Sequence, residues 1–293
     1  METQQSRRLQ LMPCLFVLLQ GLIYGFGDAS YKLAVVDMPC YSLLSLRYLI
    51  ATLLILPFAG HRMAVVLKRS SLRAWLPTCL CMAGTNLLGN MAMARTAATS
   101  VAFLRSLSTV MTPLLAMAVL RKRMSRKHIP IQLLVVLGLY LLCGQGGLSG
   151  FGMGEILALL AALLLAGSLV FGETALEQMD SLALTGLQTV ASALLMTVCA
   201  FLFDGGWNLE MTTIPVWLTI FYLAVPCSIL GIMLQNVALT RISSRAVALL
   251  QCFCPVMTAC FSRVLLGERL NLAGMIGAAM ILLCVAAETT MQE

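Results

Sequence analysis

Four polar residues recur at a constant spacing inside an apolar stretch near the start of the chain: Gln20, Tyr24, Asp28 and Lys32. On a helix, a spacing of four places side chains along one slowly winding face. Asp28 lies four residues before Lys32, which is the favourable order for a helical ion pair. This face could bind a charged or polar ligand, or Asp28 and Lys32 could neutralise each other near a surface.

Three arginines, Arg47, Arg105 and Arg263, also interrupt apolar stretches. An ionisable residue inside a membrane helix costs about 2.5–3.5 kcal/mol on insertion scales, so it is a functional candidate. Arginine keeps its charge and needs a partner, and the first half of the chain offers only Asp28 and Asp37 nearby. A guanidinium binds a carboxylate through two parallel hydrogen bonds. Arg47 and Arg105 are therefore candidates to bind a carboxylate, unless they reach headgroups or helix-end carbonyl groups.

Amide side chains form a second group of candidates. Asn86 and Asn90 lie four residues apart, Asn236 follows Gln235, and Gln251 lies within another apolar stretch. Amides both donate and accept hydrogen bonds. We expect Asn86, Asn90, Asn236 and Gln251 to contact a substrate, with hydrogen bonds between helices as the alternative use.

The residues for other chemistries are missing. His61 and His128 lie in expected loops without an acid cluster, and no H-x-x-x-H, G-x-S-x-G or phosphate-binding loop occurs. The C-x-C pairs that begin at Cys79 and Cys252 have no histidine nearby. We therefore expect no metal site, no cofactor and no enzymatic activity.

The elements that must position these residues are membrane helices. Of the 293 residues, 60% are hydrophobic and 11% are charged, with a mean hydropathy of +0.94, whereas a soluble domain carries about 25% charged residues. Spanning roughly 30 Å of hydrocarbon takes about 20 apolar residues. We expect an all-α polytopic protein of the lipid bilayer with about ten membrane helices. The expected spans are 11–34, 41–59, 74–94, 98–120, 129–145, 154–173, 182–203, 214–238, 245–266 and 271–288.

Basic residues in short loops predict the orientation. They cluster at 62–73 and 121–127, on the same side as Arg7 and Arg8 if ten helices are counted. We expect that side to be the cytoplasm of a bacterial inner membrane, with both termini cytoplasmic and the first helix retained. The net charge of +7 is explained by this loop bias and implies no nucleic-acid partner.

The chain repeats itself. With an offset of 146 residues, Asn90 falls on Asn236, Arg95 on Arg241, and the run 110–112 on 256–258. The halves 1–146 and 147–293 carry net charges of +12 and −5. Five helices in each half would insert the second half upside down, and inverted repeats are typical of alternating-access transporters. The repeat pairs Arg105 with a neutral residue, Gln251.

With this repeat, the chain resembles the drug/metabolite transporter superfamily, EamA branch. The run from Leu265 to Leu270 (LLGERL), followed by Gly274 and Gly277, is similar to the family's "l-G-E-x-l" element. Leu46-Arg47-Tyr48 resembles "l-R-f", and Tyr24-Gly25 with Lys32 resembles "W-G…K". The first-half counterpart of Glu268 is Lys122, which departs from the family pattern.

The resemblance implies a ten-helix permease for small metabolites, often an exporter. Combined with the two arginines, it predicts a secondary transporter for an amino acid or another carboxylate. The acids Asp28 and Glu173, together with Tyr24 and Lys32, are expected to act in gating or coupling. Coupling to protons and homodimer formation stay open. A membrane-embedded enzyme and a non-transporting channel or sensor are the alternative functions.

Overall fold

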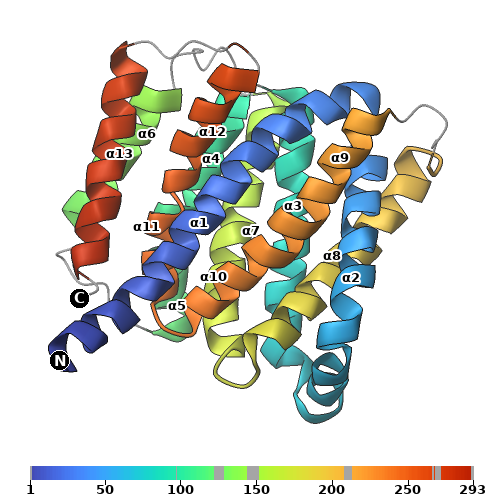
Figure 1. Cartoon of the computed structure of the whole chain (residues 1–293), viewed down its shortest axis with the longest axis horizontal. Helices are drawn as coiled ribbons and strands as arrows, with labels where there is room; N and C mark the ends of the chain where they lie inside the picture. The colour runs from blue at the N-terminus through green and yellow to red at the C-terminus, as the bar shows by residue number, and fades with distance from the viewer. Residues whose placement is uncertain are drawn as a thin grey trace.

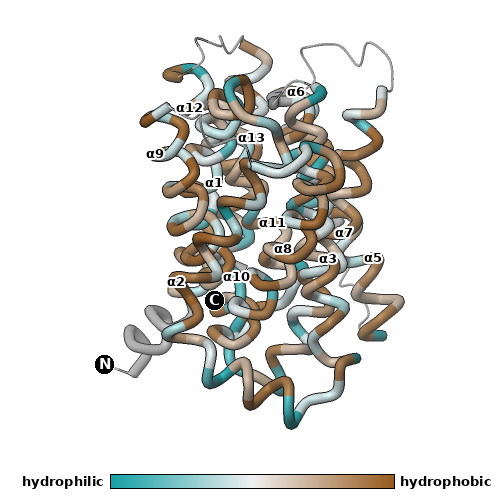
Figure 2. The backbone as a smooth tube through the Cα atoms, turned by 90° about the vertical axis from the view of Figure 1, so that its right-hand side faces the viewer, coloured by the Kyte–Doolittle hydropathy of each residue, from teal (hydrophilic) through white to brown (hydrophobic). Residues whose placement is uncertain are grey.

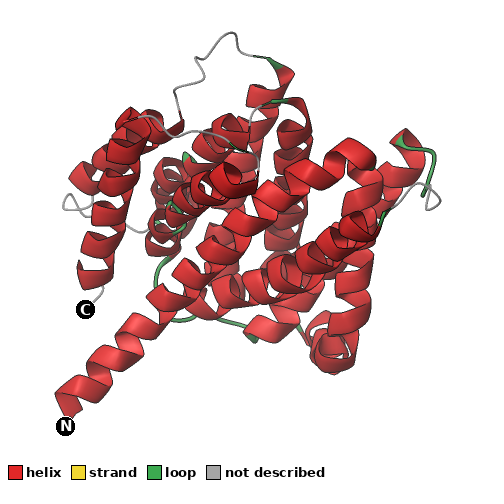
Figure 3. Ribbon diagram, turned by 45° about the horizontal axis from the view of Figure 1, so that its top comes forward, coloured by secondary structure: helices red, strands yellow, loops and turns green. Residues whose placement is uncertain are grey.

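The computed structural model describes residues 2–96, 98–121, 129–143, 152–207, 213–265, 267 and 272–291. Within these ranges all regular secondary structure is helical, as Figure 3 shows. The motif residue Glu268 and its counterpart Lys122 lie outside the described residues, as do several basic residues of the 121–127 loop.

The helices follow one another with short connections (Figure 1). Those of the first half are α1 (Glu2–Asp37), α2 (Cys40–Arg69), α3 (Leu72–Arg95), α4 (Ala98–Ser106), α5 (Ser108–Leu120) and α6 (Ile129–Cys143). Those of the second half are α7 (Met153–Ala175), α8 (Ser181–Phe203), α9 (Ile214–Tyr222), the π-helix η3 (Leu223–Gly231), α10 (Ile232–Leu239), α11 (Ser244–Leu250), α12 (Phe253–Leu265) and α13 (Leu272–Met291).

Each of the ten expected stretches coincides with one helix or with a broken helix. The expected helix 98–120 is interrupted at Leu107, and the expected helix 245–266 is interrupted at Gln251 and Cys252. Pro255 explains the second break, because its ring lacks an N–H and clashes with the carbonyl four residues earlier, that of Gln251. Likewise, α9 ends at Tyr222, four residues before Pro226, where the π-helix takes over.

Packing between the two halves follows a two-fold pattern. The helix α3 packs along α7, and its repeat counterpart, the segment α9–η3–α10, packs along α1. Two further pairs join counterparts directly: α2 packs against α8, and α6 against α13. Exchanging the two halves therefore leaves this set of contacts nearly unchanged. The start of α1 and the end of α13 lie at the same end of the bundle (Figure 1).

Hydrophobic side chains cover the outside of this bundle. Leu53, Phe58 and Leu202 are all more than 65% exposed, whereas Gln20 and Arg47 are buried inside. Figure 2 shows hydrophobic residues along most of the helices and hydrophilic ones mainly toward the two ends of the bundle. Such an apolar outer face and polar interior is expected of a chain whose solvent is lipid.

Seven described segments are long and apolar enough to span a membrane, and two shorter apolar helices lie at 130–141 and 272–288. Helix α3 is not among the seven, and its middle carries Asn86 and Asn90. The chain is thus a multi-pass helical membrane protein. The count of ten spans stays a prediction.

Candidate functional site

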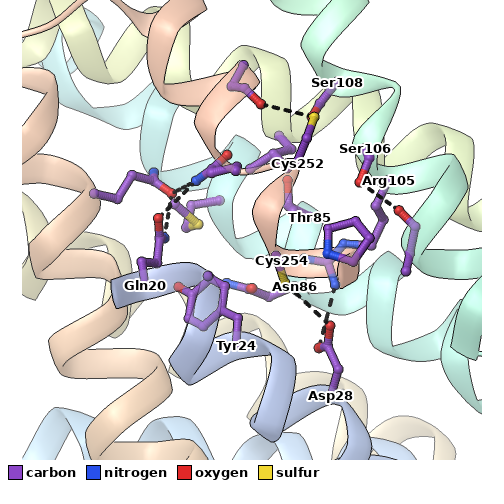
Figure 4. A pocket seen from close by; sticks show the side chains of 18 residues that line it. Gln20, Tyr24, Asp28, Thr85, Asn86, Arg105, Ser106, Ser108, Cys252 and Cys254 are labelled. Atoms are coloured by element: carbon purple, nitrogen blue, oxygen red, sulfur yellow. Dashed lines mark hydrogen bonds and ion pairs between the residues drawn. The ribbon is translucent and has the colours of Figure 1, made fainter. Parts of the chain in front are cut away.

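A cavity lined by both polar and apolar side chains lies between the two halves. Its volume is about 60 Å³, enough for a few water molecules at roughly 10–15 Å³ each. The wall is formed by α1, α3, α7, α10 and both helix breaks (Figure 4). A second cavity of about 30 Å³ shares Tyr24, Asp28, Asn86 and Arg105 with the first. The two cavities therefore meet at these four side chains.

The helix breaks bring equivalent positions of the two halves to the cavity. Arg105 lies in the last turn of α4 and Gln251 caps the end of α11. These positions are 146 residues apart, so the repeat relates them. Both line the same cavity. Interrupted helices near the middle of a bundle are common around the binding sites of transporters with repeats.

Asp28 and Arg105 form a loose ion pair across this cavity. An Nη1 atom of Arg105 lies 3.9 Å from Oδ1 of Asp28, with 22% and 20% of the two side chains exposed. The other contacts of Asp28 are also long, at 3.4 Å to Oγ1 of Thr258 and 4.0 Å to Sγ of Cys254. Nε of Arg105 has no hydrogen-bond partner. Figure 4 shows this ion pair as a dashed line between Arg105 and Asp28.

Two glycines lie beside this pair. A methyl group on Gly25 would lie 2.8 Å from the backbone nitrogen of Thr258, so glycine lets α1 approach α12 closely. A methyl group on Gly89 would lie 3.4 Å from Cδ and Nε of Arg105. The Arg105 side chain therefore packs against α3 at Gly89.

Arg47 is the more deeply buried arginine, with 7% of its surface exposed. Its Nε donates to Oγ of Ser228 at 2.8 Å, and its guanidinium lies 5.0 Å from the centre of the Tyr48 ring. In the described part of the chain, no carboxylate lies within ion-pair distance of Arg47. The second cavity borders it, so its charge is available to a ligand.

Three glutamines form a hydrogen-bonded triad at the other side of the cavity. Gln251 donates to Oε1 of Gln235 at 2.8 Å and to Oε1 of Gln20 at 3.2 Å, and Gln20 donates to Oε1 of Gln235 at 3.1 Å. They come from α1, α10 and the break between α11 and α12. Figure 4 shows Gln20 and Asp28 at opposite ends of the stretch of α1 that lines the cavity.

Most of the residues predicted from sequence gather here. Tyr24, Asp28, Asn86 and Arg105 line both cavities, Gln251 lines the first, and Arg47 and Asn90 line the second. Nδ2 of Asn86 is buried without a partner, whereas Asn90 donates to the backbone oxygen of Asn86.

Asn236 does not line either cavity. It is fully buried and donates to Oγ1 of Thr185 at 2.9 Å and to Oε1 of Gln188 at 2.8 Å. Gln188 in turn donates to Thr78. This network joins α10, α8 and α3. Its geometry favours the alternative use of Asn236, hydrogen bonding between helices.

The two remaining candidates contact helix ends. Lys32 donates to the backbone oxygens of Met93 and Thr96, at the end of α3, at 2.8 and 3.0 Å. Glu173 accepts a hydrogen bond from the backbone nitrogen of Ser244, at the start of α11, at 2.8 Å. Each charge therefore lies where it favours the helix dipole. Asp28 makes its ion pair with Arg105.

Several contacts of the site were not predicted. Gln20 belongs to the polar face expected from the sequence, but its triad with Gln235 was not predicted. Nor were the contact of Ser228 with Arg47 and that of Thr258 with Asp28. Pro226 and Pro255 were the available signals, because each marks an interruption beside the cavity. Arg263, the third arginine considered, is exposed near the end of α12. Among the described residues, no three His, Cys, Asp or Glu side chains are grouped to hold a metal ion.

The fold and the cavity define a class of protein, that of multi-pass helical membrane proteins with a cavity between two halves that charged and amide side chains line. The sequence profile of the EamA-like transporter family matches the chain twice, at residues 11–144 and 152–287. The chain therefore belongs to the EamA-like transporter family. This confirms the resemblance seen in its motifs and repeat.

Known structures agree with the fold. The chain is matched by 29 chains of solved structures. One, titled only "Crystal structure of protein", has a TM-score of 0.74 and 17% sequence identity, over 94% of this chain and 98% of that chain. At this identity the likeness shows the fold alone. None of the curated proteins compared with the chain matches it.

Proposed function

We propose that this protein is a secondary transporter that moves a small carboxylate-bearing metabolite, such as an amino acid, out of a bacterial cell. The observation that supports this proposal is the charge of the side chains that line the cavity. Of the described residues that line its two parts, Arg47 and Arg105 are cationic and only Asp28 is acidic. One positive charge is thus left for a ligand to neutralise.

A carboxylate fits this charge and its geometry. Guanidinium groups bind carboxylates through paired hydrogen bonds, and Arg47 has only Ser228 and the Tyr48 ring as described partners. The unpaired Nδ2 of Asn86 offers a further donor. Arg47, Arg105, Asn86, Asn90 and Gln251 would form the substrate site, and the export direction follows the family resemblance.

Alternating access through two inverted halves is supported by the packing. Helices that the repeat relates either pack against each other or pack against helices that are themselves related by the repeat. The family profile also matches once in each half. Seven spans, the two shorter apolar helices and α3 would together give ten crossings. The proposed units are residues 1–146 and 147–293.

The orientation can be tested with reporters. We propose that both termini are cytoplasmic. In the ten-span topology most of the basic loop residues lie on the same side of the membrane as the termini, and such residues favour the cytoplasmic side. A reporter active only in the periplasm, fused after Glu155 or after Asp204, should be active at both places. The same reporter after Arg69 or Ala175 should be silent. Activity after Arg69 would reverse the proposed orientation.

Transport itself is tested in proteoliposomes. Labelled amino acids and organic acids would be offered with and without an imposed proton gradient, which also examines proton coupling. We expect saturable uptake of at least one carboxylate, and a weaker apparent affinity in Arg47→Gln. Arg263→Gln is the matched control, because it removes an exposed arginine near the end of α12. Equal losses in both variants would argue against a carboxylate site at Arg47.

A further inference from the structure

The glutamine triad contains two polar atoms that the protein leaves unsatisfied. Nε2 of Gln235, a donor, and Oε1 of Gln251, an acceptor, are buried and have no hydrogen-bond partner. Gln235 is only 1% exposed. The two side chains are directly bonded to each other through their remaining amide atoms, at 2.8 Å. A free donor and a free acceptor therefore belong to two directly bonded side chains that both line the cavity.

Such a pair is unfavourable without a ligand. A buried polar group that lacks a partner loses its hydrogen bonds to water and gains none in return. The neighbouring network shows that this chain can satisfy a buried glutamine: Gln188 accepts from Asn236 and donates to Thr78. Gln188 does not line either cavity. In that network Oδ1 of Asn236 is also unpaired, but Asn236 does not line the cavity, whereas both Gln235 and Gln251 do.

We propose that the triad is a subsite for a primary carboxamide on the transported carboxylate. This inference rests on the proposed function, since the ligand's carboxylate would bind at Arg47 and Arg105. At the other end of the ligand, the amide oxygen accepts from Nε2 of Gln235 and the amide N–H donates to Oε1 of Gln251. The substrate class is a carboxylate with an uncharged amide at its far end.

Other polar groups match the two atoms less well. A second carboxylate cannot donate to Oε1 of Gln251, and an ammonium cannot accept from Nε2 of Gln235. A hydroxyl must serve both atoms from a single oxygen, whereas an amide presents its donor and acceptor on two adjacent atoms. A methyl ketone keeps the acceptor but leaves Oε1 of Gln251 unpaired, and sites built for a hydrogen-bonding group reject analogues that lack it.

The test compares matched probes in the wild-type protein. Uptake of succinamate and glutaramate into proteoliposomes is compared with that of levulinate and 5-oxohexanoate, in which a methyl replaces the amide NH₂ at equal length. We expect one amide to have an apparent affinity about tenfold tighter than its ketone. Affinities within about twofold for both pairs would overturn the amide subsite and leave the proposed function intact. Uptake of none of the four, beside uptake of another carboxylate, would also overturn the amide subsite, whereas uptake of no carboxylate at all would contradict the proposed function.

A variant of Gln251 tests whether the triad causes the preference for amides over ketones. Gln251→Met removes the acceptor and should reduce the ratio of amide to ketone affinity to about twofold or less. Gln188→Met, which removes a buried amide away from the cavity, should keep the preference. Retention of the full preference in Gln251→Met would overturn the assignment. The comparison of probes in the wild-type protein decides the question even if a variant fails to fold.

Discussion

Asn90 and Asn236 occupy equivalent positions of the two halves but have different surroundings. Asn90 lines the cavity beside Arg47, whereas Asn236 is enclosed in the network with Thr185 and Gln188. The repeat therefore preserves the asparagine and the helix that carries it, but the contacts of the two asparagines differ. Where the first half leaves space around a buried cation, the second half fills the equivalent place with hydrogen-bonded side chains.

The same divergence separates Arg105 from Gln251. Each lies at a helix break. Arg105 contacts Gly89, and Gln251 contacts Gln235, the residue that the repeat pairs with Gly89. The break after α4 carries a charged side chain that packs against a glycine, and the break after α11 carries an amide that is hydrogen-bonded to two other amides. A ligand between them would meet a cationic end and a neutral, hydrogen-bonding end.

Removing the buried charge of Arg47 should have the largest effect on carboxylate affinity. Arg47→Gln is expected to weaken the apparent affinity for a carboxylate by between about tenfold and a hundredfold, the range for hydrogen bonds to a charged group. The melting temperature should not fall, since the variant removes a charge with no described acidic partner. Measurements of affinity and of thermal unfolding together decide whether Arg47 binds the ligand or stabilises the fold. A destabilised protein with unchanged affinity would make Arg47 a structural residue.

Making the two breaks alike should have the next largest effect. Arg105→Gln copies the second half, and we expect about a tenfold loss of carboxylate affinity. Arg105→Lys keeps the charge but loses the planar fork, so a smaller loss of about threefold is expected. Affinities from uptake at varied substrate concentration measure both. An unchanged affinity in Arg105→Gln would exclude Arg105 from the anion site.

The sequence predicted the positions of the helices better than their interruptions. Apolar runs set the ten stretches, because length and hydrophobicity depend on local composition. The break at Leu107 has no proline four residues later, so it depends on packing around the cavity. The partners of Lys32 were also not predictable, because they are backbone oxygens of α3, more than sixty residues away in the chain.

Removing the acid of the loose ion pair should have a moderate effect. Asp28→Asn is expected to slow transport about fivefold, corresponding to an ion pair of about 1 kcal/mol in a partly exposed setting. Expression should be normal. Initial rates normalised to the amount of reconstituted protein provide the measurement. Wild-type rates would mean that Asp28 has no part in gating or coupling.

The smallest effect is expected at the acid of the second half. Glu173→Gln keeps an oxygen that can accept from the backbone of Ser244 but loses the charge at the start of α11, an interaction of about 0.3–1 kcal/mol. We expect transport to slow about twofold. A loss as large as that of Asp28→Asn, in the same assay, would give the two acids equal roles and weaken the contrast between the halves.

The π-helix η3 makes the length of its segment as important as its composition. Ser228, which holds Arg47, also donates to the backbone oxygen of Leu223, five residues earlier. Deleting one residue between Tyr222 and Ser228 would let ordinary α-helical bonds form and would turn every later side chain by about 100°. Ser228 would leave Arg47, and Gln235 would leave its triad. This segment should therefore accept many substitutions during evolution but no loss of a single residue.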